Sequence, residues 1–354
     1  MGTKRRAVGV WVAAISVGAT AWGAPPASPA AATAAATRPA PRQIALPGAP
    51  ATGVVMDFIA YDPAHRRLWV PAGDTGSVDV IDLATDKVSR LEGFATKETE
   101  RNGRKRTMGP SSVVVGDGTV YVGNRGDDTI CALDAVSLQK GACIKLDSMP
   151  DAIAFVPSAK EVWVTTQANN SIVVLDASSR SALPVKTTMT LAGSPECFAV
   201  DDARGIVYTN LEDKDRTVAI DVKTRQVAKT WLPDCGEVGP RGLALDQKRN
   251  FLLVACTTRV RVLDAGHDGK QVGSIDVGEG IDAIDYLAPR NRLYAAGGRA
   301  AKLVVAGLDD KGALTPVETI STVPSARNAV VTEKGVAYLT DAHDGSILVV
   351  EPPR

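Results

Sequence analysis

Histidine is scarce in this chain, which has only three histidines in 354 residues, at His65, His267 and His343. All three stand in short polar segments that are far apart in the sequence, so a Ser-His-Asp arrangement or a three-histidine metal site has little to build on. The sequence also lacks the GxSxG, HExxH and P-loop motifs. It therefore offers no basis for the chemistries that these motifs carry.

An excess of charge of either sign is also absent, because 40 basic residues balance 40 acidic residues and the formal net charge is zero. Generic binding to nucleic acid or to an anionic membrane normally needs a basic surface. We therefore expect no nucleic-acid partner. The sequence also has no apolar run of the roughly 20 residues that a membrane-spanning helix requires.

The N-terminus is expected to direct export. Residues 1–23 form a predicted signal peptide, with a basic start at residues 4–6, an apolar run of Ala, Val and Gly, and small residues before Ala24. An uncleaved membrane anchor is the alternative, and the short apolar run disfavours it. Residues 24–41, rich in Ala, Pro and Thr, form a predicted disordered linker, and residues 42–354 a single domain. We expect a secreted or periplasmic protein with no membrane span after cleavage.

A repeated pattern of short strands fills the predicted domain. In the stretch Pro150–Asp176 three strands rich in β-branched and aromatic residues alternate with polar turns, and a weaker fourth strand follows. The acid that ends the third strand recurs at intervals of 52, 42, 45, 43, 45 and 42 residues, as Asp82, Asp134, Asp176, Asp221, Asp264, Asp309 and Glu351. This period predicts an all-β, seven-bladed β-propeller with four-stranded antiparallel blades.

The ends of the domain complete the predicted ring. Pro110, Pro150, Pro195, Pro240 and Pro324 precede five of the seven first strands, and Met56 and Ile281 take that place in the other two. The last repeat stops after its third strand. We expect Arg42–Leu46 to supply the fourth, so that an N-terminal strand closes the ring and removes an open sheet edge.

Runs such as VYVGNRGDDTICALD and VWVTTQANNSIVVLD resemble the YVTN-type repeat of secreted bacterial and archaeal β-propellers, the YncE-like group. The resemblance covers about residues 56–351. It implies the propeller fold and export. It implies little about activity, because members are mostly known as binding or surface proteins without an agreed catalytic motif.

Strand alternation aligns one position in each repeat, two residues before the first inward apolar residue of the first strand. The residues at this position are Asp57, Ser111, Asp151, Glu196, Arg241, Asp282 and Arg327. We expect this charge ring to surround the mouth of the central channel, where convergent polar groups favour ligand binding. Carboxylate oxygens would also suit a hard cation such as calcium. In the structural alternative, the two arginines neutralise the carboxylates and set the blade register.

Further candidates lie near the ring. Asn124, Gln167 and Asp341 follow second strands, where capping of a turn is their alternative role. His343, with Asp341 and Asp344, is a weak acid–base candidate on the same face, and a surface turn is the alternative. We expect the other two histidines on the opposite face.

The long interval between the first two repeats is explained by a polar insertion, Ala95–Gly109, which is expected to overhang the charge ring. Its basic residues are Lys97, Arg101, Arg104, Lys105 and Arg106. They could attract an anionic group of a ligand or partner. Because Glu98 and Glu100 lie among them, a solvated, mobile loop is the alternative.

Five cysteines in an exported chain predict disulfides, with one cysteine left over. Cys131 and Cys143 flank a turn at a spacing that can place them opposite each other across a hairpin. For the others we expect a Cys235–Cys256 disulfide, with Cys197 buried and free. The alternative, a soft-metal thiolate site, lacks a neighbouring histidine and a fourth ligand.

Two functions of different classes fit the sequence. The first is an exported, monomeric, non-enzymatic propeller that binds a protein, peptide or small polar ligand on its loop-rich face without a cofactor. The second is a lactonase-like hydrolase that depends on a divalent cation such as calcium. Glu196, Asp151 or Asp282 would then be a metal ligand or base. Arg241 would hold a carboxylate or phosphate of the substrate.

Overall fold

The computed structural model describes residues 1–2, 9, 13, 39–101 and 103–351, so most of the predicted signal peptide and most of the linker lie outside the described residues. The chain divides into two units, Met1–Arg38 and Pro39–Arg354, and the second holds the sheets. In the described residues no helix has the length and apolar character to cross a membrane.

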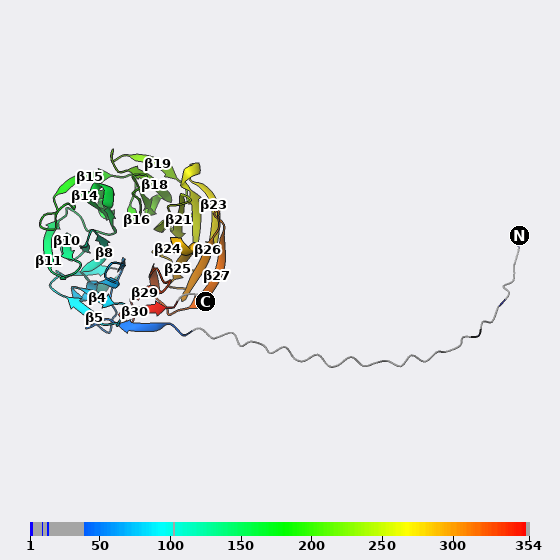
Figure 1. Ribbon diagram of the computed structural model, residues 1–354, viewed down its shortest axis with the longest axis horizontal. Coiled ribbons are helices and arrows are strands. Elements are labelled where there is room, and N and C mark those ends of the chain that lie inside the picture. The colour runs from blue at the N-terminus through cyan, green and yellow to red at the C-terminus, as the bar shows by residue number, and fades with distance from the viewer. Residues whose placement is uncertain (3–8, 10–12, 14–38, 102, 352–354) are drawn as a thin grey trace. The chain divides into compact units, whose positions relative to one another are not determined.

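The second unit is a seven-bladed β-propeller, which confirms the predicted fold (Figure 1). In the described residues seven sheets have four antiparallel strands each, and one further sheet has two. Blade 1 contains β2 (Ala60–Asp62), β3 (Arg67–Ala72), β4 (Ser77–Asp82) and β5 (Val88–Leu91). Blade 2 contains β8 (Pro110–Gly116), β9 (Thr119–Asn124), β10 (Thr129–Asp134) and β11 (Lys140–Lys145). Blade 3 contains β12 (Ile153–Val156), β13 (Glu161–Thr166), β14 (Ser171–Asp176) and β15 (Val185–Thr190).

The other blades repeat the order. Blade 4 contains β16 (Pro195–Asp201), β17 (Ile206–Leu211), β18 (Arg216–Asp221) and β19 (Val227–Trp231), and blade 5 contains β20 (Pro240–Asp246), β21 (Phe251–Cys256), β22 (Arg259–Asp264) and β23 (Lys270–Asp276). Blade 6 contains β24 (Ile284–Leu287), β25 (Arg292–Gly297), β26 (Lys302–Leu308) and β27 (Leu314–Ser321). Blade 7 contains β28 (Ala326–Val331), β29 (Ala337–Asp341), β30 (Ser346–Val350) and β1 (Arg42–Ala45). Six short 3-10 helices occupy turns in the described part: η1 (Gly73–Thr75), η2 (Pro157–Ala159), η3 (Gln167–Asn169), η4 (Glu212–Lys214), η5 (Ala265–His267) and η6 (Ala288–Arg290).

The first strands form the inner wall of the ring. Each contacts the first strand of the next blade, from β2 and β8 round to β28 and back to β2. The predicted closure is confirmed, because β1 pairs antiparallel with β30 and brings Ile44 opposite Ile347. The N-terminal strand thus becomes the outer strand of blade 7, and the sheet edge of β30 is covered.

Each blade buries both of its faces against its neighbours, because the side chains of a strand point alternately to opposite sides. In β3, Leu68 packs toward blade 7 and Trp69 toward blade 2. The equivalent bulky residue on the face toward the next blade is Trp69, Tyr121, Trp163, Tyr208, Leu253, Tyr294 and Tyr338 in blades 1 to 7. The core is therefore seven apolar interfaces, one between each pair of adjacent blades.

The recurring acids end the third strands as predicted. The Asp82 carboxylate, for example, accepts hydrogen bonds from the backbone N–H groups of Ala84 and Thr85 at 2.9 and 3.0 Å. The Asp264 carboxylate does the same for Gly266 and His267. These bonds hold the turn that leads into the outer strand.

The predicted disulfides are confirmed. Cys131 and Cys143 lie directly opposite each other on β10 and β11 and are bonded. Cys235 is bonded to Cys256, and Cys197 is the free cysteine of the described residues. Burial raises the pKa of the Cys197 thiol to about 12, so this thiol is protonated and a poor nucleophile.

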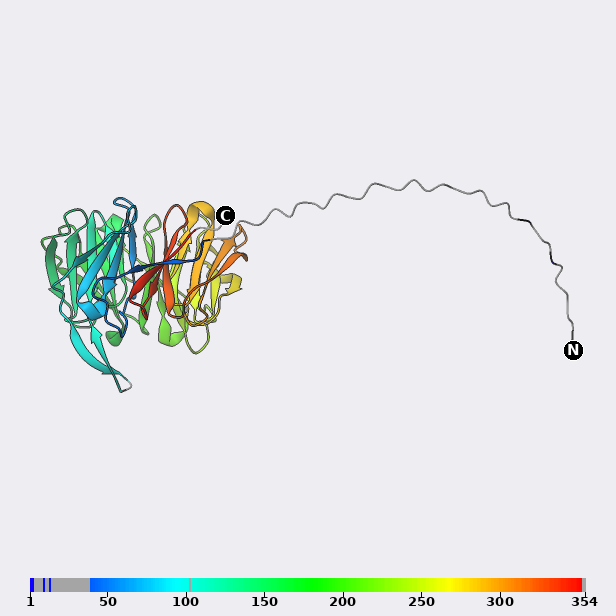
Figure 2. The same ribbon diagram turned by 90° about the horizontal axis from the view of Figure 1, so that it is seen from below.

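The insertion between blades 1 and 2 forms a two-stranded hairpin. Its strands, β6 (Lys97–Arg101) and β7 (Arg104–Met108), pair only with each other in the described chain. Figure 2 shows this hairpin, in cyan, projecting beyond one face of the ring. Its base is fixed because Asn124 donates to the Ala95 carbonyl at 3.0 Å and the Arg125 N–H to the Gly109 carbonyl at 2.9 Å.

The closing strand generates a stability prediction. Ile44 is 7% exposed and belongs to the apolar interface between blades 7 and 1. Replacing it by alanine should lower the free energy of unfolding by about 2–5 kcal/mol, measured by urea denaturation. Arg42→Ala is the control, because its ion pair with Asp86 joins two side chains that are each more than 40% exposed and should cost less than about 1 kcal/mol. Equal losses in both variants would contradict a closing role for Ile44.

Candidate functional site

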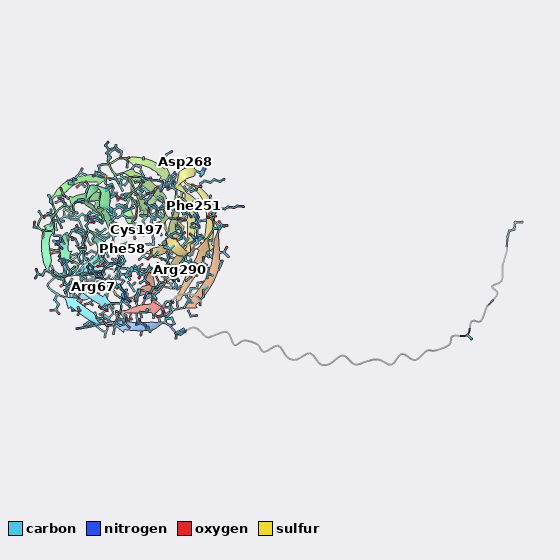
Figure 3. The ribbon with its side chains drawn as sticks, viewed as in Figure 1. Phe58, Arg67, Cys197, Phe251, Asp268 and Arg290 are labelled. Carbon is cyan, nitrogen blue, oxygen red and sulfur yellow. A yellow bond between two sulfur atoms is a disulfide. The ribbon has the colours of Figure 1, made fainter. Side chains whose placement is uncertain are left out.

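The seven positions of the predicted charge ring lie at the beginnings of the first strands. Ser111, Glu196, Arg241 and Arg327 are the second residues of β8, β16, β20 and β28. The other three, Asp57, Asp151 and Asp282, lie two or three residues before their strands. Figure 3 shows Phe58 and Cys197, the sequence neighbours of Asp57 and Glu196, near the centre of the ring, and Asp268 at its periphery.

Five charged side chains form a continuous chain of ion pairs across the channel mouth. Arg125 contacts Asp151 with one guanidinium nitrogen, and its other, Nη1, lies 2.6 Å from Asp57 Oδ2. The second Asp57 oxygen lies 2.9 Å from Arg327 Nη2. Arg327 Nη1 then reaches Asp282 Oδ2 at 2.8 Å. This network links blades 3, 2, 1, 7 and 6.

In the structural alternative, the two arginines of the ring neutralise its carboxylates. The ion pairs show that this holds for only part of the ring. Arg327 neutralises ring carboxylates, as that interpretation requires. Arg241 instead forms its ion pair with Glu212 at 2.7 Å, although its positive charge also acts to lower the pKa values of Asp57, Glu196 and Asp282. The cation that joins Asp57 to Asp151 is instead Arg125, which the sequence analysis did not assign to the ring.

Arg125 and Glu212 share a register that the sequence analysis missed. Each is the first residue after the second strand of its blade, as is Gln167. Each contacts the ring residue of the following blade: Arg125 contacts Asp151, Gln167 donates to Glu196, and Glu212 pairs with Arg241. The same position is Gly73 in blade 1 and Gly298 in blade 6. A signal in the sequence would have been a long polar residue at this register.

Burial and ion pairing shift the pKa values of the ring carboxylates in different directions. Burial alone would raise the pKa of Asp57, but the guanidinium groups of Arg125 and Arg327 lower it below its ordinary value. Burial raises the pKa of Asp151 to about 6 despite its contact with Arg125, and it also raises the pKa of Asp282. Asp57 is therefore the most firmly ionised member of the network.

Glu196 is the ring carboxylate without a cationic partner among the described residues. It is 6% exposed, and it accepts a hydrogen bond from the Gln167 amide. Burial raises the pKa of Glu196 well above its ordinary value, and the negative charges of Asp151 and Asp282 raise it further. A buried carboxyl of this kind keeps its proton to a higher pH than an exposed glutamate does.

A cavity of about 610 Å³ lies beside this network, between the β6–β7 hairpin and blades 2 and 3. We call it the blade 2–3 cavity, and its lining includes Ser111, Arg125, Met149, Gln167 and Ala168. The Ser111 hydroxyl is buried and makes no hydrogen bond to the described residues. It is one of five such hydroxyls in the described residues, with those of Ser112, Thr257, Thr322 and Ser346, and its residue lines a cavity of ligand size.

The remaining candidates have structural contacts. Asn124 caps its turn, because its side-chain oxygen accepts from the Gly126 N–H at 2.9 Å. Asp341 is buried and accepts from Ser325 Oγ at 2.8 Å. His343 pairs with Asp344 rather than Asp341, and its side chain is 84% exposed, as expected for a surface turn.

The other two histidines each pair with an aspartate three residues earlier in the chain, His65 with Asp62 and His267 with Asp264. Both belong to turns at the strand ends opposite the charge ring, as predicted. In the described residues no group of three or more His, Cys, Asp or Glu side chains is arranged to hold a metal ion.

Comparisons with known proteins support the fold alone. Neither protein families nor curated protein sequences match the chain. A chain in the crystal structure of the mitotic checkpoint complex is 12% identical with a TM-score of 0.72, covering 98% of this chain and all of the other. Streptogramin B lyase is 11% identical with a TM-score of 0.68, over 88% and 97% of the two chains. U3-55K is 11% identical with a TM-score of 0.70, over 88% and 98%.

The unpaired hydroxyl generates a second prediction. Ser111→Ala removes a buried donor that lacks a partner, so the free energy of unfolding without ligand should rise by about 1 kcal/mol. Ser77→Ala is the matched control, because the Ser77 hydroxyl is buried and bonded to Thr75 Oγ1 at 2.7 Å. It should lose about 1 kcal/mol in the same urea titration. A loss of stability in Ser111→Ala would show that the hydroxyl is already satisfied.

Glu196 generates a pH prediction. Because its pKa is raised in the folded state, ionising it costs stability as the pH rises from the unfolded value of about 4.3 through the folded one. Glu196→Gln removes that cost. The variant should match the parent near pH 4 and be more stable at pH 8, measured by urea unfolding across that range. The exposed Glu237→Gln should show no such divergence. A variant less stable than the parent at pH 8 would contradict the assignment.

Proposed function

We propose that this chain is an exported, non-enzymatic β-propeller that binds a peptide or small polar ligand in the blade 2–3 cavity. The observation that carries the proposal is the convergence there of Ser111, Arg125 and Gln167 on a space of about 610 Å³. That volume is within the range of ligand sites, and the lining combines donors, a cation and the apolar Met149.

The arrangement of the site favours binding over catalysis. Arg125 is held rigidly by two carboxylates, which makes it a fixed hydrogen-bonding surface. Ser111 borders the same space, and its hydroxyl has no hydrogen-bond partner in the described residues. A guanidinium that is already fixed in position is preorganised for a polar ligand.

The disulfides of the propeller and features of the sequence both support export. Two disulfides join residues 131 to 143 and 235 to 256, and disulfides persist in oxidising compartments. The predicted signal peptide and the resemblance to the YVTN-type, YncE-like propellers support the same compartment. The likeness to other propellers supports a scaffold that presents loops to a partner.

The proposal is tested by thermal unfolding of the chain with amino acids, short peptides, sugars, lactones and divalent cations. A ligand at a hundred times its dissociation constant should add about 2.7 kcal/mol, a shift of several degrees for a domain of this size. Ala168→Trp, which fills an exposed edge of the cavity, should abolish the shift. Ala64→Trp, exposed on the opposite face, is the matched control and should keep it.

The outcomes separate the two functions set out from the sequence. A peptide or sugar shift that Ala168→Trp removes supports binding in the cavity. A calcium shift that Glu196→Gln removes would favour the cation-dependent hydrolase and would call for lactonase assays. A shift that both tryptophan variants retain would place the ligand elsewhere and contradict the proposal.

A further inference from the structure

A second and larger cleft opens on the other side of the β6–β7 hairpin. We call it the blade 7 cleft; its volume is about 900 Å³, and it lies between β7, the segment 52–56 and loops of blades 6 and 7. Arg106 and Thr107 line both this cleft and the blade 2–3 cavity. The hairpin therefore separates two binding-sized spaces on one face of the ring.

The lining of the blade 7 cleft includes more basic than acidic side chains. Lys105, Arg106 and Arg299 line it, and all three are exposed. Within the described residues none of them has an ion-pair partner, although most other arginines of the propeller do. The lining also has two acids: Asp74, which accepts a hydrogen bond from the Val55 N–H at 2.5 Å, and Glu98 of β6, which lies opposite Thr107. The cleft thus offers three cations that the fold does not use.

The strand β7 meets the cleft along its edge. Three consecutive residues, Lys105, Arg106 and Thr107, line the cleft, and successive side chains of a strand point to opposite faces. In the described chain β7 pairs with β6 on one side and with no strand on the other. An extended peptide can add to such an edge through main-chain hydrogen bonds.

The channel mouth next to the cleft disfavours a long polyanion. Its carboxylates are Asp57, Asp151, Glu196, Asp282 and Glu212, and its guanidinium groups are Arg125, Arg241 and Arg327. Negative groups therefore outnumber positive ones at the mouth. A short ligand with a few carboxylates fits the cleft, whereas a nucleic-acid strand continuing over the mouth would be repelled.

From these observations we infer that the blade 7 cleft binds an extended acidic peptide segment of a partner protein. The peptide lies along β7, and its carboxylates pair with Arg106 and Arg299, whose guanidinium groups suit bidentate contacts. Lys105 adds a third positive charge. Arg106 lines both spaces, whereas Lys105 and Arg299 line the blade 7 cleft alone, so the effect of Arg299 distinguishes this inference from binding in the blade 2–3 cavity.

Fluorescence anisotropy tests the inference on the full chain with a fluorescein-labelled hexapeptide of three Glu-Val repeats. The parent should bind this peptide and bind its Gln-Val counterpart at least about tenfold more weakly. Arg106→Glu and Arg299→Glu should each weaken binding by about tenfold or more, and 0.5 M salt should weaken it further. Both residues are exposed, so the melting temperatures should stay unchanged.

Lys248→Glu is the matched control, because it makes the same charge reversal at an exposed position in the β20–β21 turn at the other end of the strands. Its affinity for the peptide should remain within twofold of the parent. The inference is overturned if the parent does not bind, if the Gln-Val peptide binds equally well, or if Lys248→Glu weakens binding as much as the cleft variants. Stronger binding of a ten-nucleotide oligothymidylate through Arg106 and Arg299 would also overturn it, in favour of a nucleic-acid site.

Discussion

The whole structure depends on the packing of each blade against two neighbours. A four-stranded sheet with two apolar faces is not stable by itself in water, and the blades here have apolar side chains on both faces, as Leu68 and Trp69 of β3 show. The last blade must therefore meet the first. The strand β1 completes this closure from the other end of the chain, which makes stability a property of the ring rather than of any single blade.

Closure of the ring also brings charged side chains close together at the channel mouth. Seven equivalent positions are brought together there, and most of them are charged. Carboxylates that would be fully hydrated in a single blade lose water in the ring, and burial is the largest influence on the pKa values of Asp57, Asp151 and Glu196. Arg125 and Arg327 offset that cost on one side of the mouth. Glu196 is left with an amide partner, so the two sides of the mouth differ in chemistry although the blades are alike.

Much of the fold and part of the site could be predicted from the sequence. The strands, their order and the ring positions follow from local periodicity, because a strand alternates its side chains and a turn needs particular residues such as Asp82. Arg125 and Glu212 occupy the same register as Gln167, which was named from the sequence, but their ionic partners belong to the next blade, so the repeat alone does not show which charges they meet. The insertion was recognised as basic, but its pairing as β6 and β7 and the two spaces beside it depend on how its base is anchored against Asn124 and Gly109.

By itself the sequence determined the number of blades and the closing strand, and it offered the disulfide pairs and seven positions at the channel mouth as candidates. These features repeat along the chain or follow from short-range spacing, so periodicity is sufficient to specify them. Only the tertiary structure decided which cation neutralises which acid, why Glu196 lacks one, and where the cavities open beside the hairpin. The physical reason is that charge pairing, desolvation and cavity shape are set by groups from different blades, whose distances exist only after the ring has closed.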